Sequence, residues 1–158
     1  MNYDGLYGIN NVNRLLQTSN PEEGVNWRES TYKVGDPVLF FETERFRPAI
    51  YNNLKGWIVG IEQEAGQIRF DVKLDRPLSE LDVWDIPELE YVGESVVRFP
   101  VFDFDVSDED DDSLNTTMPF QVAYAVSIHK AQGLEYDSVK IVITDANEDD
   151  LTHSIFYT

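Results

Sequence analysis

The sequence predicts a mixed α and β protein in which a small β barrel is inserted into part of an α/β unit. Short strand-like runs separated by turn signals occupy the middle of the chain. The segments on either side have a helical or a mostly apolar pattern, and a strongly acidic stretch separates the middle from the last part. With 158 residues, 42% of them hydrophobic, the chain is long enough for one ordinary domain or for two small pieces.

The first 30 residues are expected to hold a short amphipathic helix, at about residues 10–16. Its apolar residues recur at helical spacing: Ile9, Val12, Leu15 and Leu16. The following Asn20-Pro21 is a stop signal, because proline cannot continue a helix. We therefore assign residues 1–30 to a helical part that precedes the barrel.

Residues 31–102 are expected to form the barrel. Four runs have strand-like composition: 37–41, 56–61, 67–74 and 95–99. In the third run apolar and charged residues alternate, which is typical of a half-buried antiparallel strand. Ala65-Gly66 lies between the second and third runs and is suited to a hairpin turn, since glycine accepts a positive φ. Several such strands in a short stretch favour a closed barrel without exposed edges.

Residues 103–119 are expected to be an acidic connector. Seven of the ten positions from Asp103 to Asp112 are acidic. A calcium loop of the EF-hand type is excluded, because that loop needs alternating ligands around a central glycine. Like charges at this density repel one another and remain hydrated, so we interpret the segment as a solvated loop.

Residues 120–158 are expected to be part of an α/β unit. The runs 123–127 and 138–144 are mostly apolar, as buried parallel strands are, and 148–158 has a helical pattern. The polar segment 128–137 joins the two expected strands. Loops of this kind commonly bind ligands in α/β proteins.

Composition excludes several classes of function. The chain has 12 Lys and Arg against 30 Asp and Glu, a net charge of −18, which disfavours a free-standing protein that holds DNA by a basic surface. It has no cysteine and no apolar run of membrane-spanning length, and we expect a cytoplasmic protein without a membrane partner. There is no phosphate-binding loop motif, so the chain is not expected to hold a nucleoside triphosphate or hydrolyse it alone.

The two histidines do not predict a metal site or a hydrolase. His129 and His153 have no histidine or cysteine at ligand spacing. Ser127 and His129 lack the flanking glycines of a nucleophile elbow. What remains is a loop rich in hydrogen-bond donors, which suits phosphate oxygens and contains Gly133 for close backbone approach. The residues alone also fit a plain connection with a solvated lysine.

Residues 123–137, with the sequence Ala-Tyr-Ala-Val-Ser-Ile-His-Lys-Ala-Gln-Gly-Leu-Glu-Tyr-Asp, resemble motif V of superfamily 1 DNA helicases of the RecD, Dda and UvrD type. Residues 8–21 resemble the helix before the inserted barrel of RecD-like enzymes. Residues 33–38 and 51–56 resemble the first strand and hairpin entry of that SH3-like insertion, and 149–158 resembles the helix that leads into motif VI. The resemblance implies a partial RecA-like domain, of the P-loop NTPase type, that ends before motif VI.

The resemblance also implies roles for individual residues. Ser127, His129 and Lys130 would touch the backbone of single-stranded DNA. Gln132 and Gly133 would link this contact to the nucleotide cleft, and Glu135 would face the ATP ribose or the phosphates. The full-length enzyme would be an ATP-dependent DNA helicase, or a helicase-exonuclease subunit, that uses ATP and Mg²⁺. Its first RecA-like domain would supply the catalytic residues, so none is expected in this fragment.

The barrel is expected to add contacts of its own or to serve another purpose. Arg45, Phe46, Tyr51 and Trp57 are candidates for a surface on which bases stack, although Phe46 and Trp57 also fit a place in the core. The alternative function is a binding module in which the acidic SH3-like barrel recruits a basic protein partner. A pure interaction module has no evident use for the order from His129-Lys130 to Glu135, and this order favours the helicase.

Overall fold

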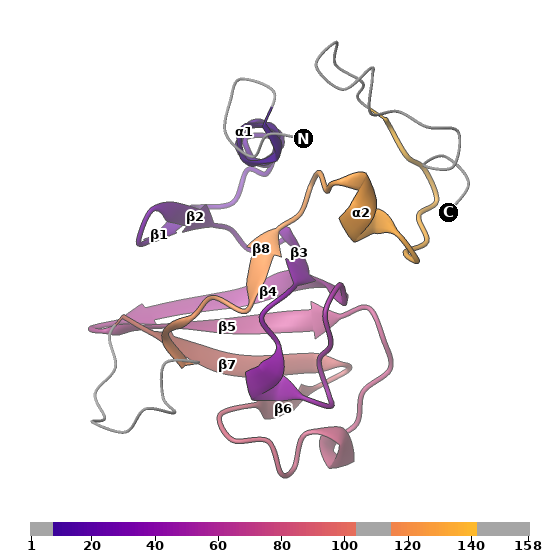
Figure 1. Ribbon diagram of the computed structural model, residues 1–158. Helices are drawn as coiled ribbons and strands as arrows, with labels where there is room; N and C mark the ends of the chain where they lie inside the picture. Colours follow the sequence, from indigo (N-terminus) through magenta and orange to yellow (C-terminus); the bar gives the residue numbers. More distant parts are fainter. Residues whose placement is uncertain (1–7, 104–114, 142–158) are drawn as a thin grey trace.

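The computed structural model describes residues 8–103 and 115–141 and shows a mixed, mostly β fold with two short α-helices (Figure 1). The helices and strands are α1 (Ile9–Gln17), β1 (Val25–Trp27), β2 (Ser30–Tyr32), β3 (Pro37–Phe40), β4 (Lys55–Glu64), β5 (Gln67–Leu74), β6 (Glu90–Gly93), β7 (Val96–Phe102), β8 (Phe120–Val122) and α2 (Ile128–Ala131). Two short 3₁₀ turns, η1 (Glu44–Phe46) and η2 (Glu80–Asp82), lie in the connections. The predicted mixed class is confirmed at this level.

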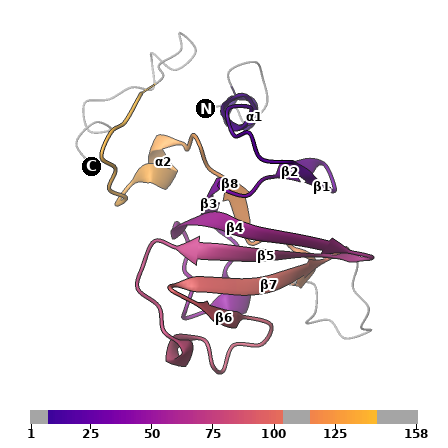
Figure 2. The same ribbon diagram turned by 180° about the vertical axis from the view of Figure 1, so that it is seen from behind.

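Six strands form one antiparallel sheet in the order β6-β7-β5-β4-β3-β8 (Figures 1 and 2). The four predicted strand runs correspond to β3, β4, β5 and β7. The turn between β4 and β5 falls at the predicted place, with Gly66 at a φ of +82°. Along β5 the apolar residues Ile68, Phe70, Val72 and Leu74 are all buried, as the alternation predicts.

The chain returns to this sheet after the acidic stretch. Strand β8 pairs antiparallel with β3, with Phe120 opposite Phe40 and Val122 opposite Val38. The predicted strand over 123–127 is wrong, because the strand ends at Val122 and the chain leaves the sheet there. Residues 138–141 are exposed and form no strand either. Within the described residues, all strand pairs are antiparallel.

The core is aromatic and spans several of the predicted segments. Five ring pairs among Phe40, Phe70, Phe99 and Phe120 have centroids 5.0–6.3 Å apart, and all but the Phe70–Phe99 pair are edge to face. Phe120 therefore belongs to the core of the sheet, although the sequence places it after the connector. Trp27 belongs to the same core, although the sequence places it before the barrel.

The predicted helix is present as α1, but its buried face is not the predicted one. Leu15 is 70% exposed and Leu16 is also exposed, whereas Asn13 and Gln17 are buried together with Ile9. The polar residues can be buried because their amides bond to distant segments of the chain. Neither α1 nor α2 has the length or apolar character needed to cross a bilayer.

Some predicted features lie outside the described residues. These are most of the acidic connector (104–114), the end of the last expected strand (142–144) and the expected helix at 148–158, together with His153.

Candidate functional site

The residues predicted to contact DNA lie on α2 and at its N-cap. The Ser127 hydroxyl accepts a hydrogen bond from the backbone N–H of Lys130 at 3.4 Å, and the Ser127 carbonyl accepts one from Ala131 at 3.0 Å. A side-chain acceptor at the N-cap is what a helix start requires. The imidazole of His129 is exposed beside it. This local order explains why serine precedes the two basic residues.

Lys130 is held against the end of the sheet. Its Nζ atom donates to Oε1 of Gln121, on β8, at 2.9 Å and lies 5.3 Å from the ring centroid of Phe41. The lysine is half-buried in consequence. A cation fixed in this way remains able to interact with an anion at the surface, and it is better ordered than a freely rotating lysine.

The chain then turns away from α2 at Gly133. This residue has a φ of +79°, a conformation that favours glycine, and a Cβ there would meet nothing within 4 Å. The glycine is therefore required by the turn and not by a close neighbour. Gln132 and Glu135, on either side of it, are both exposed.

An open groove of about 1180 Å³ separates the sheet from the segment that follows this turn. Tyr51 and Trp57 line it on the sheet side, and Gly133 and Glu135 line it on the other side. Tyr51 and Trp57, two of the predicted barrel contacts, thus line the same groove as two residues predicted for the nucleotide cleft, Gly133 and Glu135. Ser127, His129, Lys130 and Gln132 are not among its lining residues.

Lys55 joins the two walls of the groove. Its Nζ atom donates to the backbone carbonyl of Glu135 at 2.9 Å and lies 3.1 Å from a carboxylate oxygen of Asp75. The same ammonium is 4.6 Å from the ring centroid of Tyr136. Nothing in the sequence pattern distinguishes Lys55 from the other lysines, since its role depends on a segment far along the chain.

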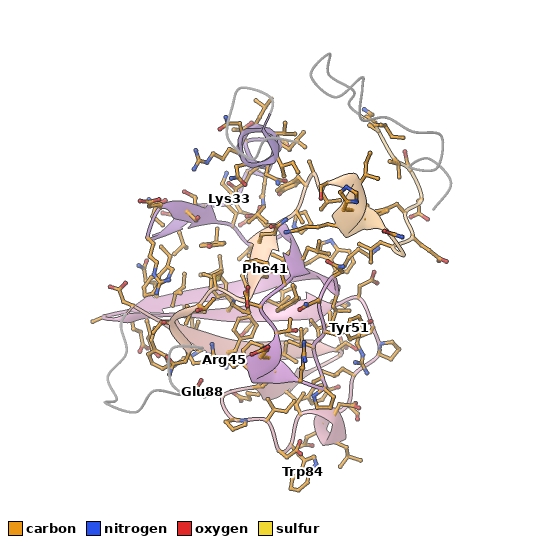
Figure 3. The ribbon with its side chains drawn as sticks, viewed as in Figure 1. Lys33, Phe41, Arg45, Tyr51, Trp84 and Glu88 are labelled. Atoms are coloured by element: carbon orange, nitrogen blue, oxygen red, sulfur yellow. The ribbon has the colours of Figure 1, made fainter. Side chains whose placement is uncertain are left out.

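The sequence allows Phe46 either a stacking role or a place in the core, and Phe46 lies in the core. The stacking role expected of Arg45 does not fit its position, because its side chain points inward. Phe46 is fully buried and packs 4.9 Å from Phe99, between ring centroids. The side chain of Arg45 is only 7% exposed, and its Nη2 atom donates to Oε2 of Glu88 and to the carbonyl of Pro100, both at 2.7 Å (Figure 3). Burial lowers the pKa of Arg45, with Glu88 opposing this effect. Its guanidinium connects η1 to the sheet and to the loop before β6.

Asp36 is a structural centre that the sequence analysis missed. Its carboxylate is fully buried and accepts hydrogen bonds from Gln17 at 2.5 Å, from Asn20 at 2.9 Å, from the backbone N–H of Lys33 at 2.9 Å and from the hydroxyl of Tyr124 at 2.8 Å. These donors come from α1 and the turn that follows it, the turn before β3, and the segment before α2. One side chain therefore ties three separate parts of the chain together.

A second polar contact reinforces this junction. The side-chain amide of Asn13 donates to the carbonyl of Ala125 at 3.0 Å and accepts from the N–H of the same residue at 2.7 Å. The Asn13 side chain thus bonds to both the N–H and the carbonyl of Ala125, as the backbone of a residue in a neighbouring antiparallel strand would. The segment that leads to Ser127 is consequently fixed against α1 without belonging to any strand.

We expect Tyr124 to ionise at unusually high pH. Burial and the hydrogen bond to Asp36 raise its pKa from 10.0 to about 12. A folded-state pKa above the unfolded one means that the contribution of Tyr124 to stability is complete below pH 10 and is lost as the pH rises toward 12. Tyrosinate absorbance of the native protein and of Y124F measures this. The titration curve of Y124F should lack only the tyrosine that ionises at the highest pH. If Y124F instead lacks a tyrosine that ionises near pH 10, the assignment is contradicted.

The arrangement suits anion contact more than catalysis. A hydroxyl, an imidazole and an ammonium gather at one exposed turn, and no group of three or more metal-ligating side chains occurs in the described parts of the chain.

Comparison of the chain with protein-family models, with curated proteins and with solved structures found no match.

Proposed function

We propose that this chain is part of an ATP-dependent DNA helicase, in which an SH3-like barrel is inserted into a partial RecA-like domain. The observation that carries the proposal is the order from Ser127 to Glu135, which resembles motif V and is presented on an exposed turn at the end of the sheet. The proposed task of the turn is to contact single-stranded DNA through Ser127, His129 and Lys130.

The chemistry of the turn supports phosphate contact. Lys130 supplies a positive charge, and the imidazole of His129 and the hydroxyl of Ser127 supply hydrogen-bond donors that are not specific for any base. Backbone contacts of this kind serve an enzyme that moves along DNA of any sequence. The net charge of −18 does not oppose a local contact, because 13 of the acids lie in the last 58 residues and seven of these lie between Asp103 and Asp112.

The nucleotide side of the proposal rests on Gln132, Gly133 and Glu135. In the chain they directly follow the residues proposed to contact DNA. A movement of the turn at Gly133 on nucleotide binding would therefore be transmitted to α2 along one short segment. ATP would supply the energy and Mg²⁺ would neutralise its phosphates. The proposal places the residues that bind both in the first RecA-like domain, and the present chain would form one side of the cleft and have no ATPase activity alone.

Exposed apolar residues support the presence of further protein around this chain. Leu15 and Leu16 on α1, and Val139 and Ile141 after the groove, are all exposed. These residues belong to the segments that the resemblance assigns to the RecA-like domain. Each of these two pairs of neighbouring exposed apolar side chains offers a surface on which another part of a protein can pack.

The DNA contact predicts weak, salt-sensitive binding of single-stranded oligonucleotides by the chain alone. K130A should reduce the affinity and lower the slope of log K against log salt by about 0.7, the effect of losing one phosphate contact on a single strand. Fluorescence anisotropy at several salt concentrations measures both. R69A is the control, because Arg69 lies toward the other end of β5, where it pairs with Glu62 and does not line the groove. Equal effects of K130A and R69A would reject the assigned contact.

The helicase activity itself is tested in the full-length protein. There, single-stranded DNA should stimulate ATP hydrolysis, and H129A should reduce the stimulation several-fold with little change in the unstimulated rate. The coding sequence on either side should contain a phosphate-binding loop upstream and motif VI downstream. Absence of both motifs would reject the helicase, and unchanged stimulation in H129A would reject only the role of His129.

The second candidate function is a binding module that recruits a basic protein. The observation that favours it is the acidic segment 77–97, the loop between β5 and β6 with β6 and the start of β7, which has six Asp and Glu and no Lys or Arg. The two candidates differ in what the full-length protein does with ATP. A module of this kind would show no DNA-stimulated hydrolysis.

A further inference from the structure

The loop between β5 and β6 exposes two large apolar side chains. Leu81 is 80% exposed and Trp84 is 76% exposed. Trp84 points away from the body of the molecule at the far end of this loop (Figure 3). We refer to residues 77–90 as the Trp84 loop. A tryptophan exposed to this degree on an ordered surface is unusual, because tryptophan is on average among the more buried residues.

The backbone of the Trp84 loop is held by a series of short hydrogen-bonded turns. The N–H groups of Asp82, Val83, Ile86 and Leu89 each donate to the carbonyl three residues earlier. In this geometry every third side chain lies on the same side. Val83, Ile86 and Leu89 accordingly lie in the core, and the other side of the same turns presents Leu81 and Trp84 to solvent.

Two polar contacts fix the ends of these turns. The carboxylate of Asp82 accepts from the backbone N–H and the hydroxyl of Ser79, both at 2.7 Å, and these bonds lower the pKa of Asp82. At the other end, Glu88 pairs with the buried Arg45. The position of Trp84 is thus set before any partner arrives, which reduces the entropy lost on binding.

The Trp84 loop itself is acidic. Residues 77–90 contain Glu80, Asp82, Asp85, Glu88 and Glu90 and no Lys or Arg. Glu88 pairs with Arg45 and Arg76 helps to lower the pKa of Asp82, so Glu80 and Asp85 are the exposed acids next to Leu81 and Trp84 in the sequence. Such a field repels the phosphates of DNA, which excludes Trp84 as a stacking site for bases. It also repels a second copy of this chain, whose net charge is −18.

We infer that the Trp84 loop is a docking surface for a basic protein, whose apolar pocket receives Trp84 and Leu81 while its Lys or Arg side chains pair with the surrounding acids. Tryptophan in a desolvated pocket is the residue type that most often dominates the binding energy of an interface. The acids around it would speed association and select the partner by charge. This docking surface rests on the second candidate function, the binding module, and names where that module would bind its partner. It does not depend on whether the protein is a helicase.

The test is a selection from a random peptide library displayed on phage, with the isolated wild-type chain as target and the L81A/W84A variant as counter-target. Selected peptides should combine Lys or Arg with aromatic or aliphatic residues, and the double variant should bind them at least tenfold more weakly. V92A is the matched control, since Val92 is exposed on the neighbouring strand β6. E80Q/D85N should weaken binding further, and most strongly at low salt.

Three outcomes would overturn the inference. They are peptides that bind L81A/W84A as well as the wild type, selected peptides without basic residues, and the absence of any peptide enriched over the counter-target. Both side chains are exposed, so the double variant should retain the unfolding midpoint of the wild type. No ATP or DNA takes part, and the result is therefore separate from the tests of the helicase.

Discussion

Replacing Phe70 with alanine should reduce the free energy of unfolding by about 4 kcal/mol, which is typical of a phenylalanine lost from a core. Phe70 is fully buried in β5, and its ring lies 5.0 Å from that of Phe120 and 5.2 Å from that of Tyr32, between centroids. The substitution removes both edge-to-face contacts and leaves a cavity. Urea unfolding followed by circular dichroism measures the loss.

The control for this substitution is W84A. It removes a larger aromatic ring, but from a side chain that is already exposed, so the expected loss is within about 0.5 kcal/mol. A loss of less than 1 kcal/mol in F70A, or losses of equal size in the two variants, would show that the core is not centred on Phe70. Comparing F70A with W84A separates the effect of losing a buried side chain from the effect of losing an aromatic ring.

The contacts of Phe70 also show what the sequence could and could not predict. The alternation along β5 identifies Phe70 as buried, because its period matches that of a strand. It cannot identify Phe120 and Tyr32 as the neighbours of Phe70, because Tyr32 precedes the first predicted strand run and Phe120 follows the acidic connector. The apolar run 123–127 predicts a buried strand, whereas the sheet uses 120–122, which begins three residues earlier.

Hydrophobic periodicity failed where polar side chains are buried. On α1 it selected Leu15 and Leu16, but the helix buries Asn13 and Gln17, whose bonding partners are supplied by distant segments. Arg45 is a candidate for a stacking surface by residue type, but its guanidinium bonds to Glu88 and to the carbonyl of Pro100. A polar side chain is buried only when other parts of the fold supply its hydrogen-bond partners. A local sequence pattern does not identify those partners.

The candidate site was predictable only in part. The order from Ser127 to Glu135 is local, and the structure places it on a capped turn as a local motif requires. The groove that joins Glu135 to Tyr51 and Trp57 is not local. It depends on Lys55, whose ammonium holds the segment after Gly133 beside β4.

Replacing Asp36 with alanine should destabilise the protein by several kcal/mol, because a buried donor that loses its acceptor costs about 1–3 kcal/mol. The substitution removes the acceptor of one N–H of the buried Gln17 amide and that of the partly buried hydroxyl of Tyr124. D36N should also be destabilising, because one of its two terminal atoms is a donor that faces donors. D85A, which removes an exposed carboxylate, is the control and should have little effect.

The same variant should reveal how the junction holds the candidate site. Tyr124 and Ala125 lead directly to Ser127, and Asp36 and Asn13 are the side chains that fix them to α1 and to the turn before β3. Under conditions where D36N is still folded, amide exchange should therefore increase at residues 124–131 and remain unchanged in β5 and β7. Equal acceleration throughout the sheet would mean that Asp36 supports only global stability. A local increase, together with weaker binding of single-stranded oligonucleotides, would make Asp36 a positioning residue for the turn, since it touches no part of the proposed DNA contact itself.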